Sequence, residues 1–131
     1  MSTFNAIGVA ATGVTVYRKW LDAVSDNIAN IDNVSRTSEK AFQARYVIAQ
    51  EAQDGNGAQV GGIAYGSPEG QLTYEPDNPL ADTEGYVRRP DIDLGSQMAQ
   101  MIMAQRAYQA NLAVVDRARD SYTAAINLGK G

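Results

Sequence analysis

The two ends of this chain share one apolar spacing, and most of the glycines and prolines lie in the sequence between them. Near each end, predominantly apolar positions recur at alternating steps of three and four. In the N-terminal part they are Ile7, Ala10, Val14, Tyr17, Leu21, Val24, Ile28 and Ile31. In the C-terminal part they are Leu94, Met98, Met101, Gln105, Tyr108, Leu112, Val115, Arg119, Tyr122 and Ile126. This period is typical of helices that pack along a shared stripe. We therefore predict a mainly α protein whose two long terminal helices pair as a coiled coil.

The predicted N-terminal helix is apolar on nearly every side over its first half. Its charged residues are confined to the second half: Arg18, Lys19, Asp22 and Asp26. A helix that is apolar all round is normally buried all round, and one partner helix does not cover every side. Its two glycines each weaken an isolated helix by about 1 kcal/mol relative to alanine. We therefore expect this helix to be disordered in the free monomer, until neighbouring subunits surround it.

Residues that start or stop helices mark the ends of both predicted helices. The N-terminal helix is predicted to be capped by Ser2 or Thr3 and to end at the polar residues of 30–33. The C-terminal helix is predicted to be capped by Asp91 or Asp93 and to end at Gly129. The resulting division is an N-terminal helix in residues 1–33, a middle segment in 34–90 and a C-terminal helix in 91–131.

The middle segment is rich in glycine and proline, and we expect it to be irregular with a small β-hairpin. Residues 60–65 and 71–74 alternate well enough for two short strands joined by a turn at 67–70. The prolines that follow predict extended backbone up to the second helix. The path of residues 37–59 is open, since 42–48 fit either a short extended segment or a helical continuation.

The charge and composition exclude several functions. The chain has 131 residues, which suits one domain, and a formal net charge of −4 from 11 basic and 15 acidic residues. Without a basic cluster, nucleic-acid binding has little electrostatic support. Cysteine and histidine are both absent, which removes thiolate nucleophiles, the usual zinc ligands and histidine as a general base. We expect no cofactor and no metal.

The uncharged stretch from Phe4 to Val16 resembles neither a signal peptide nor a membrane anchor. No basic residue precedes it, no small-residue cleavage site follows it, and it is too short to span a bilayer. We expect a soluble chain with no cleavable signal peptide and no direct membrane insertion.

One cluster of carboxylates allows an enzymatic reading. Its members are Asp77, Asp82, Glu84, Asp91 and Asp93. Two of them could form the acid–base pair of a small hydrolase that cleaves cell-wall glycan. The alternative is that they solvate a loop and cap a helix, and nothing in the sequence indicates an aromatic-lined pocket around them. We favour the alternative and expect no enzymatic activity.

Three segments together carry a family resemblance. Residues 21–30 end in Asn-Ile-Ala-Asn, and residues 98–112 contain Ala-Gln-Arg-Ala-Tyr-Gln-Ala-Asn. These resemble the N- and C-terminal signatures of the bacterial flagellar rod and hook family. Residues 74–82, followed by Gly-Tyr-Val at 85–87 and by Pro90, are similar to the segment that marks the proximal rod proteins of that family. The family often has His at position 78 and Asn at position 91, where this chain has Asn and Asp.

The resemblance implies a structural subunit of the flagellar basal-body rod. Such a subunit assembles into a helical tube that transmits torque from rotor to hook, in the part of the basal body that spans the periplasm. Its implied partners are copies of itself, other rod proteins and the flagellar export apparatus, through which it leaves the cytoplasm uncleaved. A subunit of a related secretion needle or filament is the alternative within the same class, and it would lack the 85–87 segment.

The predicted subunit interface combines the helical stripes with the signature residues. It comprises Ile7, Val14, Tyr17, Leu21, Val24, Asn27, Ile28, Asn30, Tyr86, Pro90, Met98, Met101, Gln105, Tyr108, Asn111, Leu112, Val115 and Tyr122.

Overall fold

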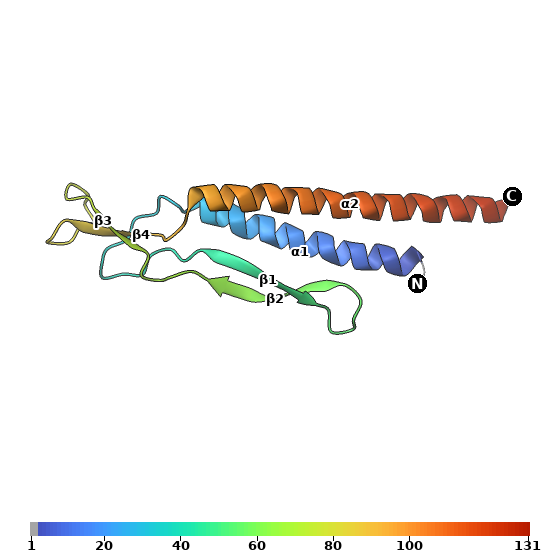
Figure 1. Ribbon diagram of the computed structural model, residues 1–131, viewed down its shortest axis with the longest axis horizontal. Coiled ribbons are helices and arrows are strands. Elements are labelled where there is room, and N and C mark those ends of the chain that lie inside the picture. The colour runs from blue at the N-terminus through green and yellow to red at the C-terminus, as the bar shows by residue number, and fades with distance from the viewer. Residues whose placement is uncertain (1–2) are drawn as a thin grey trace. The chain divides into compact units, whose positions relative to one another are not determined.

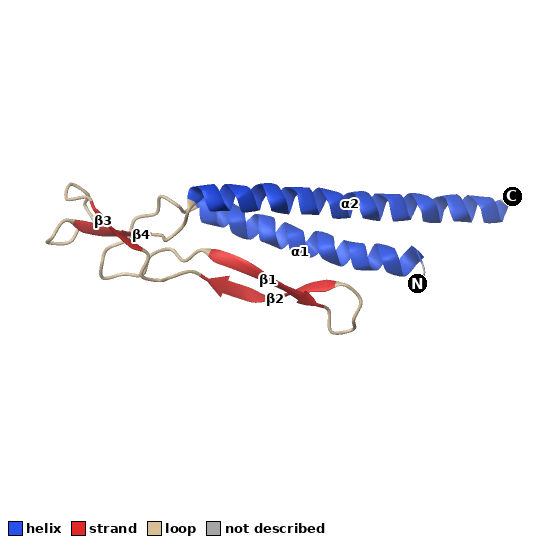
Figure 2. Cartoon of the chain, in the orientation of Figure 1, coloured by secondary structure: helices blue, strands red, loops and turns tan. Residues whose placement is uncertain are grey.

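The computed structural model describes residues 3–131 and contains two helices and four short strands (Figures 1 and 2). In chain order the elements are α1 (Thr3–Ala29), β1 (Arg45–Glu51), β2 (Ala58–Tyr65), β3 (Gln71–Tyr74), β4 (Tyr86–Arg89) and α2 (Leu94–Lys130). The helices hold 27 and 37 residues. The strands form two separate two-stranded sheets, β1 with β2 and β3 with β4. The prediction of a mainly α chain with a small β segment is confirmed.

The chain divides into two compact units, and each helix contributes to both. Unit 1 contains the chain up to Leu21, Val47–Gly62 and Ile102–Gly131. Unit 2 contains Asp22–Tyr46 and Ile63–Met101. Each unit therefore combines a part of α1, a part of α2 and a part of the middle segment.

In unit 1, α1 has α2 on one side and the β1–β2 hairpin on the other (Figure 1). The Thr12 hydroxyl joins α1 to the hairpin, because it accepts a hydrogen bond from the Ala58 backbone N–H at 3.0 Å. Gly57 permits this approach, since a Cβ at that position would lie 2.3 Å from Thr12 Oγ1. The hairpin thus gives the first half of α1 a second neighbour from its own chain, which the sequence alone did not indicate.

In unit 2, the end of α1, the segment after it and the start of α2 surround a small core. Its buried members are Ala23, Val24, Asn27, Ala41, Ala44, Val87, Pro90 and Gln97. β3 and β4 pair antiparallel, with Tyr74 opposite Tyr86 and Gln71 opposite Arg89. The other edge of β4 is held by Ser35, which exchanges backbone hydrogen bonds with Arg88 at 2.8 and 2.9 Å.

The predicted hairpin of residues 60–65 with 71–74 is wrong, although both segments are strands. β2 pairs with β1 instead, and β3 pairs with β4. The expected turn bonds to residues 41–44 rather than closing on itself: Gly66 N–H donates to the Ala44 carbonyl, and Ala41 N–H donates to the Pro68 carbonyl, both at 2.8 Å. For residues 45–51, the extended alternative is confirmed.

Pro76 and Pro79 do not hold the backbone extended, so the expectation of extended backbone is wrong for residues 75–85. Residues 75–85 form consecutive turns. The Asn78 N–H donates to the Glu75 carbonyl at 3.0 Å, and the Ala81 N–H donates to the Asn78 carbonyl at 2.9 Å. The two prolines in this stretch each follow the first residue of such a turn, where their fixed φ is favourable.

The helix ends agree with the sequence at two points and differ at one. α1 ends at Ala29, and the Asn30 side chain bonds back to the Asp26 carbonyl at 2.8 Å. Asp93 caps α2 through a bond from the Ser96 N–H to its carboxylate at 2.8 Å. Gly129 does not end α2, which continues through Lys130. The proposed cap at Ser2 or Thr3 lies outside the residues whose side chains are described.

Gly70 provides a test of unit 2. Its φ is +58°, and a Cβ there would lie 2.1 Å from the Arg89 carbonyl oxygen and 2.6 Å from Ala41 Cβ. Gly70→Ala is expected to lower the free energy of unfolding by at least about 1 kcal/mol from backbone strain alone, measured by urea denaturation. Gly62→Ala is the control, because no atom lies within 4 Å of a Cβ at Gly62. Equal stability of the two variants would contradict the assigned conformation.

Candidate subunit interface

One face of α2 is turned toward the rest of the chain. Its buried and half-buried positions repeat at steps of three and four: Gln97, Met101, Ala104, Tyr108, Asn111, Val115 and Ala118. This inner face overlaps the predicted stripe only at Met101, Tyr108 and Val115. Every seventh position on it, from Gln97 onward, is an amide or an alanine. The repeat of amides and alanines was visible in the sequence and was the signal that apolar counting missed.

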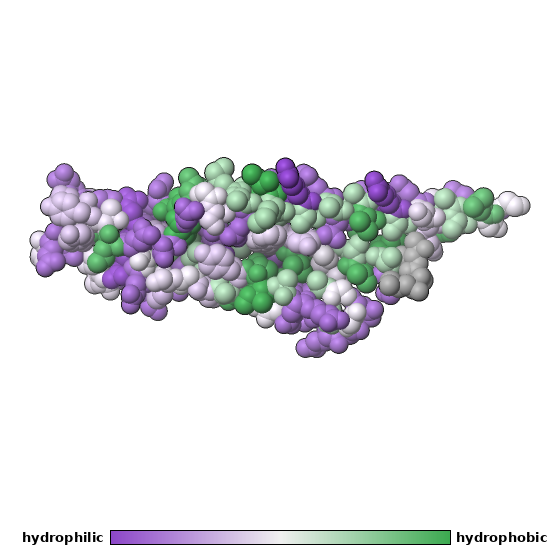
Figure 3. Space-filling view, viewed as in Figure 1, coloured by the Kyte–Doolittle hydropathy of each residue, from purple (hydrophilic) through white to green (hydrophobic). Residues whose placement is uncertain are grey.

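Four other residues of the predicted stripe, Leu94, Met98, Gln105 and Leu112, lie on a neighbouring side of α2 and are exposed, together with Ile102, which was not predicted. We call this side the outer stripe and define it as Leu94, Met98, Ile102, Gln105 and Leu112. Four of its members are large apolar side chains with exposed fractions of 36–51%. Figure 3 shows hydrophobic side chains interspersed with hydrophilic ones over α2. Exposed apolar surface of this kind marks interaction sites in soluble proteins.

The C-terminal part of α2 has no cover within unit 1. From Arg119 to Gly131 every residue is exposed. Tyr122 and Ile126 continue the inner face of the helix, yet they are 39% and 41% exposed, and Leu128 is 83% exposed. Figure 1 shows these last turns of α2 extending beyond the described start of the antiparallel helix α1.

The predicted interface residues of α1 are less accessible than those of α2. Val24 and Asn27 are fully buried within unit 2, with exposed fractions of 1% and 0%. The others are half-buried: Ile7, Val14, Tyr17, Leu21, Ile28 and Asn30. In the isolated chain, the buried pair therefore acts inside the subunit.

The Asn27 side chain is fully buried in unit 2 and forms three hydrogen bonds. Its Nδ2 donates to the Arg45 carbonyl at 2.9 Å and to Gln97 Oε1 at 3.0 Å, and its Oδ1 accepts from the Arg45 N–H at 2.8 Å. Gln97 itself is 2% exposed. Sequence reasoning placed Asn27 and Asn30 on one helical face but did not identify Gln97 or Arg45 as partners.

The predicted interface residues near β4, Tyr86 and Pro90, differ in exposure. Tyr86 is 37% exposed and contacts Tyr74 edge-on, with ring centroids 5.3 Å apart. Pro90 is buried, as is Val87. An exposed tyrosine pair is a contact surface of the type enriched in protein interfaces.

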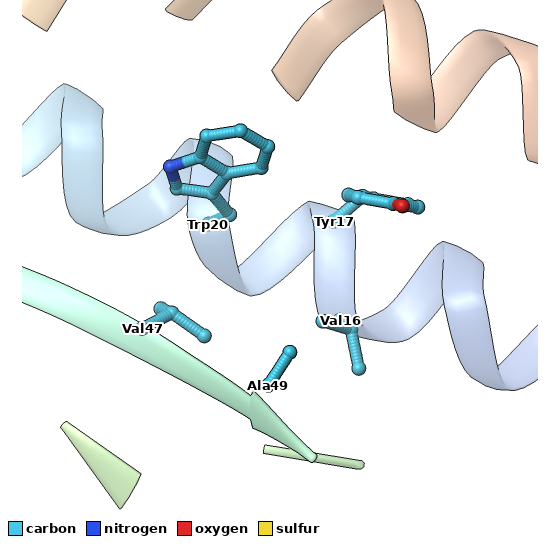
Figure 4. Close-up of a pocket in the computed structure, with 5 residues that line it drawn as sticks. All are labelled: Val16, Tyr17, Trp20, Val47 and Ala49. Carbon is cyan, nitrogen blue, oxygen red and sulfur yellow. The ribbon is translucent and has the colours of Figure 1, made fainter. Parts of the chain in front are cut away.

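A cavity of about 220 Å³ opens between α1 and β1 in unit 1. Figure 4 shows Val47 and Ala49 of β1 pointing toward Val16 of α1, with Tyr17 next to Val16 and Trp20 one turn further along. These lining residues are almost entirely apolar and include no carboxylate or basic group.

Asp82, one of the carboxylates considered for catalysis, and the nearby Glu75 both take part in local structure. Glu75 accepts hydrogen bonds from the Asn78 amide at 2.9 Å and from Arg89 Nε at 2.8 Å, and these bonds lower its pKa. Asp82 accepts hydrogen bonds at 2.9 Å from the backbone N–H groups of Tyr86 and Glu84, and the Tyr86 bond contributes most to lowering its pKa.

Two further observations concern ligands and membranes. Within residues 3–131, no group of three or more acidic side chains is placed to hold a metal ion. Neither helix in this described range has a stretch long and apolar enough to cross a bilayer.

Comparison with known proteins identifies the family. A model of the flagellar basal body rod FlgEFG protein C-terminal region matches residues 83–128. The chain is 31% identical to the flagellar basal-body rod protein FlgC of Yersinia enterocolitica, over 99% of this chain and 100% of the relative. The chain belongs to the FlgC family of flagellar basal-body rod proteins. The FlgC of Aquifex aeolicus is 32% identical over 86% of each chain.

FlgC membership confirms the resemblance drawn from the three sequence segments. The chain is a structural subunit of the flagellar basal-body rod. The matched region runs from the turn before β4 through nearly all of α2, so it contains the outer stripe and the exposed C-terminal turns. The FlgC of Borreliella burgdorferi is 30% identical across the full length of both chains.

The lowered pKa values of Glu75 and Asp82 predict how the stability of the fold changes with pH. Both pKa values are lowered by folding, so their stabilising contribution is present above the unfolded pKa values, about 4.5 and 3.8, and is lost as pH falls through the folded values. We expect the melting temperature to fall as pH decreases below about 4.5. The Glu75→Gln/Asp82→Asn variant should be less stable at pH 7 and lose less stability on acidification. Asp77→Asn serves as the control, and an unchanged acid dependence in the double variant would contradict the prediction.

Proposed function

We propose that the chain assembles through its two terminal helices into the wall of a helical tube, the rod that transmits torque from rotor to hook. The observation that carries this proposal is the apolar surface of α2 that its own chain leaves exposed. It consists of the outer stripe and of the last turns, with Tyr122, Ile126 and Leu128. Packing against α2 helices of neighbouring subunits would remove this surface from water.

The contacts proposed here are heterologous, with the outer stripe of one subunit packed against a different surface of the next. A heterologous contact whose rotation does not close into a ring builds a helical filament. The coiled-coil pairing expected from the sequence belongs to this assembled state: the inner face of α2 contacts α1 of the same chain, and the outer stripe contacts another subunit.

The partners proposed for the chain are copies of itself, other rod proteins and the flagellar export apparatus. We place the assembled protein in the part of the basal body that spans the periplasm. The name of its relatives, flagellar basal-body rod protein, supports a place in the basal body. We propose no catalytic role, because three of the candidate carboxylates have partners: Asp82 and Asp93 accept hydrogen bonds from backbone N–H groups, and Asp91 accepts one from the Gln71 amide. These carboxylates have structural roles.

Leu112 provides the test of the outer stripe. Leu112→Asp is expected to abolish rod assembly and motility, because a carboxylate buried without a partner costs several kcal/mol per subunit. The isolated subunit should remain folded, since Leu112 is already 36% exposed. Motility is measured as swarm diameter after complementing a deletion strain, and folding by circular dichroism of the purified protein.

The control is Ala110→Asp, which adds the same charge to an exposed position on the roughly opposite side of α2. Normal motility of Leu112→Asp, or equal loss in both variants, would contradict the outer stripe as the interface. Val24→Asp is unsuitable as an interface test, because Val24 is 1% exposed within the subunit and its replacement would unfold unit 2.

We also propose that the first half of α1 becomes fully ordered only in the assembled rod. Of residues 5–16, only Ala10 and Val16 are buried in the chain itself, and Gly8 and Gly13 lower the helix propensity of this half. In the purified monomer, amide exchange should be faster in residues 5–16 than in 22–29, where Asn27 anchors the helix. Equal and strong protection of both segments would show that the subunit orders this helix unaided.

A further inference from the structure

A fully buried side-chain amide stands at the point where three segments of unit 2 meet. Asn27 is 0% exposed and Gln97, its partner on α2, is 2% exposed. The Asn27 amide donates to Gln97 and also forms a reciprocal pair with the backbone N–H and carbonyl of Arg45. The end of α1, the start of β1 and the first turns of α2 are thereby joined through one side chain.

The apolar contacts around this amide do not by themselves select one alignment of the helices. Facing positions of α1 and α2 in this region are small or flexible, such as Ala23, Val24 and Met101. Because the pattern repeats every seven residues, a slip of one heptad exchanges apolar residues for other apolar residues at little cost.

The amide pair does distinguish between the alignments. If α1 slipped by one heptad toward the C-terminus of α2, Asn27 would face Ala104 instead of Gln97. Alanine has no group that accepts or donates a side-chain hydrogen bond. The slipped state would therefore leave Asn27 and Gln97 without each other, and a buried amide without a partner is strongly disfavoured.

Unit 1 by itself shows the same alignment through a different contact. Asn111 lies fourteen residues after Gln97, and it faces Gly13, which lies fourteen residues before Asn27. A Cβ at Gly13 would lie 3.0 Å from Asn111 Oδ1, so the missing side chain makes room for the asparagine. A one-heptad slip in the same direction would bring Asn111 against Trp20, where no such space exists.

We propose that Asn27 and Gln97 fix the register of α1 against α2, and that the Gly13–Asn111 contact supports the same register. Asn27 is thus a positioning residue: its bonds select one alignment among several that the apolar residues allow. Leu94 and Met98 of the outer stripe, in the first turns of α2, then keep a fixed position relative to the end of α1. The proposal concerns the single chain and holds whether or not the outer stripe is the interface between subunits.

Cysteine cross-linking of the full chain tests the register, since the sequence contains no cysteine. The native reporter is Ala23→Cys with Met101→Cys. Ala23 lies four residues before Asn27 and Met101 lies four residues after Gln97, so in antiparallel helices the two cysteines are at the same level, one turn from the amide pair. The slipped reporter is Ala23→Cys with Tyr108→Cys. At protein concentrations low enough to prevent intermolecular links, the native reporter should cross-link at least about tenfold faster than the slipped one.

Replacing both amides by leucine should weaken this preference. In the Asn27→Leu/Gln97→Leu background we expect the preference for the native reporter to fall at least about fivefold, while the Gly13–Asn111 contact supplies the remainder. An unchanged preference for the native reporter in the folded double variant would overturn the proposal.

A single replacement keeps the test decisive if the double variant does not fold. Gln97→Leu retains the bonds between Asn27 and Arg45, and it should reduce the native preference by at least about fivefold. Asn30→Ala is the matched control, because the Asn30 side chain donates to the Asp26 carbonyl, four residues earlier in the chain, and not to α2. An unchanged preference in Gln97→Leu, or an equal loss in Asn30→Ala, would overturn the proposal.

Discussion

The buried amide of Asn27 is the interaction on which the arrangement of unit 2 depends. Its three hydrogen bonds reach Gln97, which lies seventy residues later, and both backbone groups of Arg45, eighteen residues later. The core around it is built mainly from alanine and valine, which supply little shape to distinguish one packing from another. A polar contact that is satisfied in only one arrangement supplies the specificity that such a core lacks.

The two sides of α2 serve different purposes. Its inner face uses alanines and amides, so that α1 can approach closely, while its outer stripe places Met98, Ile102 and Leu112 in water. In a protein that functions alone, this outer surface would be a liability for aggregation. In a rod subunit of the FlgC family the same surface has a use, because the hydrophobic effect that disfavours its exposure favours assembly.

Sequence reasoning succeeded where the structure depends on local residues and erred where it depends on distant pairing. The positions of strands 60–65 and 71–74 were readable from their alternation. Their partners were not, because Ala44 and Ala41 take the hydrogen bonds of the expected turn and Gly70 is held against Arg89. The prolines at 76 and 79 were expected to extend the chain but start turns, since proline at the second turn position satisfies the same φ restriction.

The sequence by itself determined the family, the two long helices and the presence of apolar residues in excess of what one small core needs. These features follow from heptad spacing, helix-ending residues and signature segments, all of which are local. Only the tertiary structure decided which face of α2 turns inward, that the β1–β2 hairpin covers α1 in unit 1, and that Asn27 bonds to Gln97 and Arg45. The reason is that Leu112 and Asn111 are adjacent and both fit a helical repeat, and only packing against Gly13 shows which of them is inside.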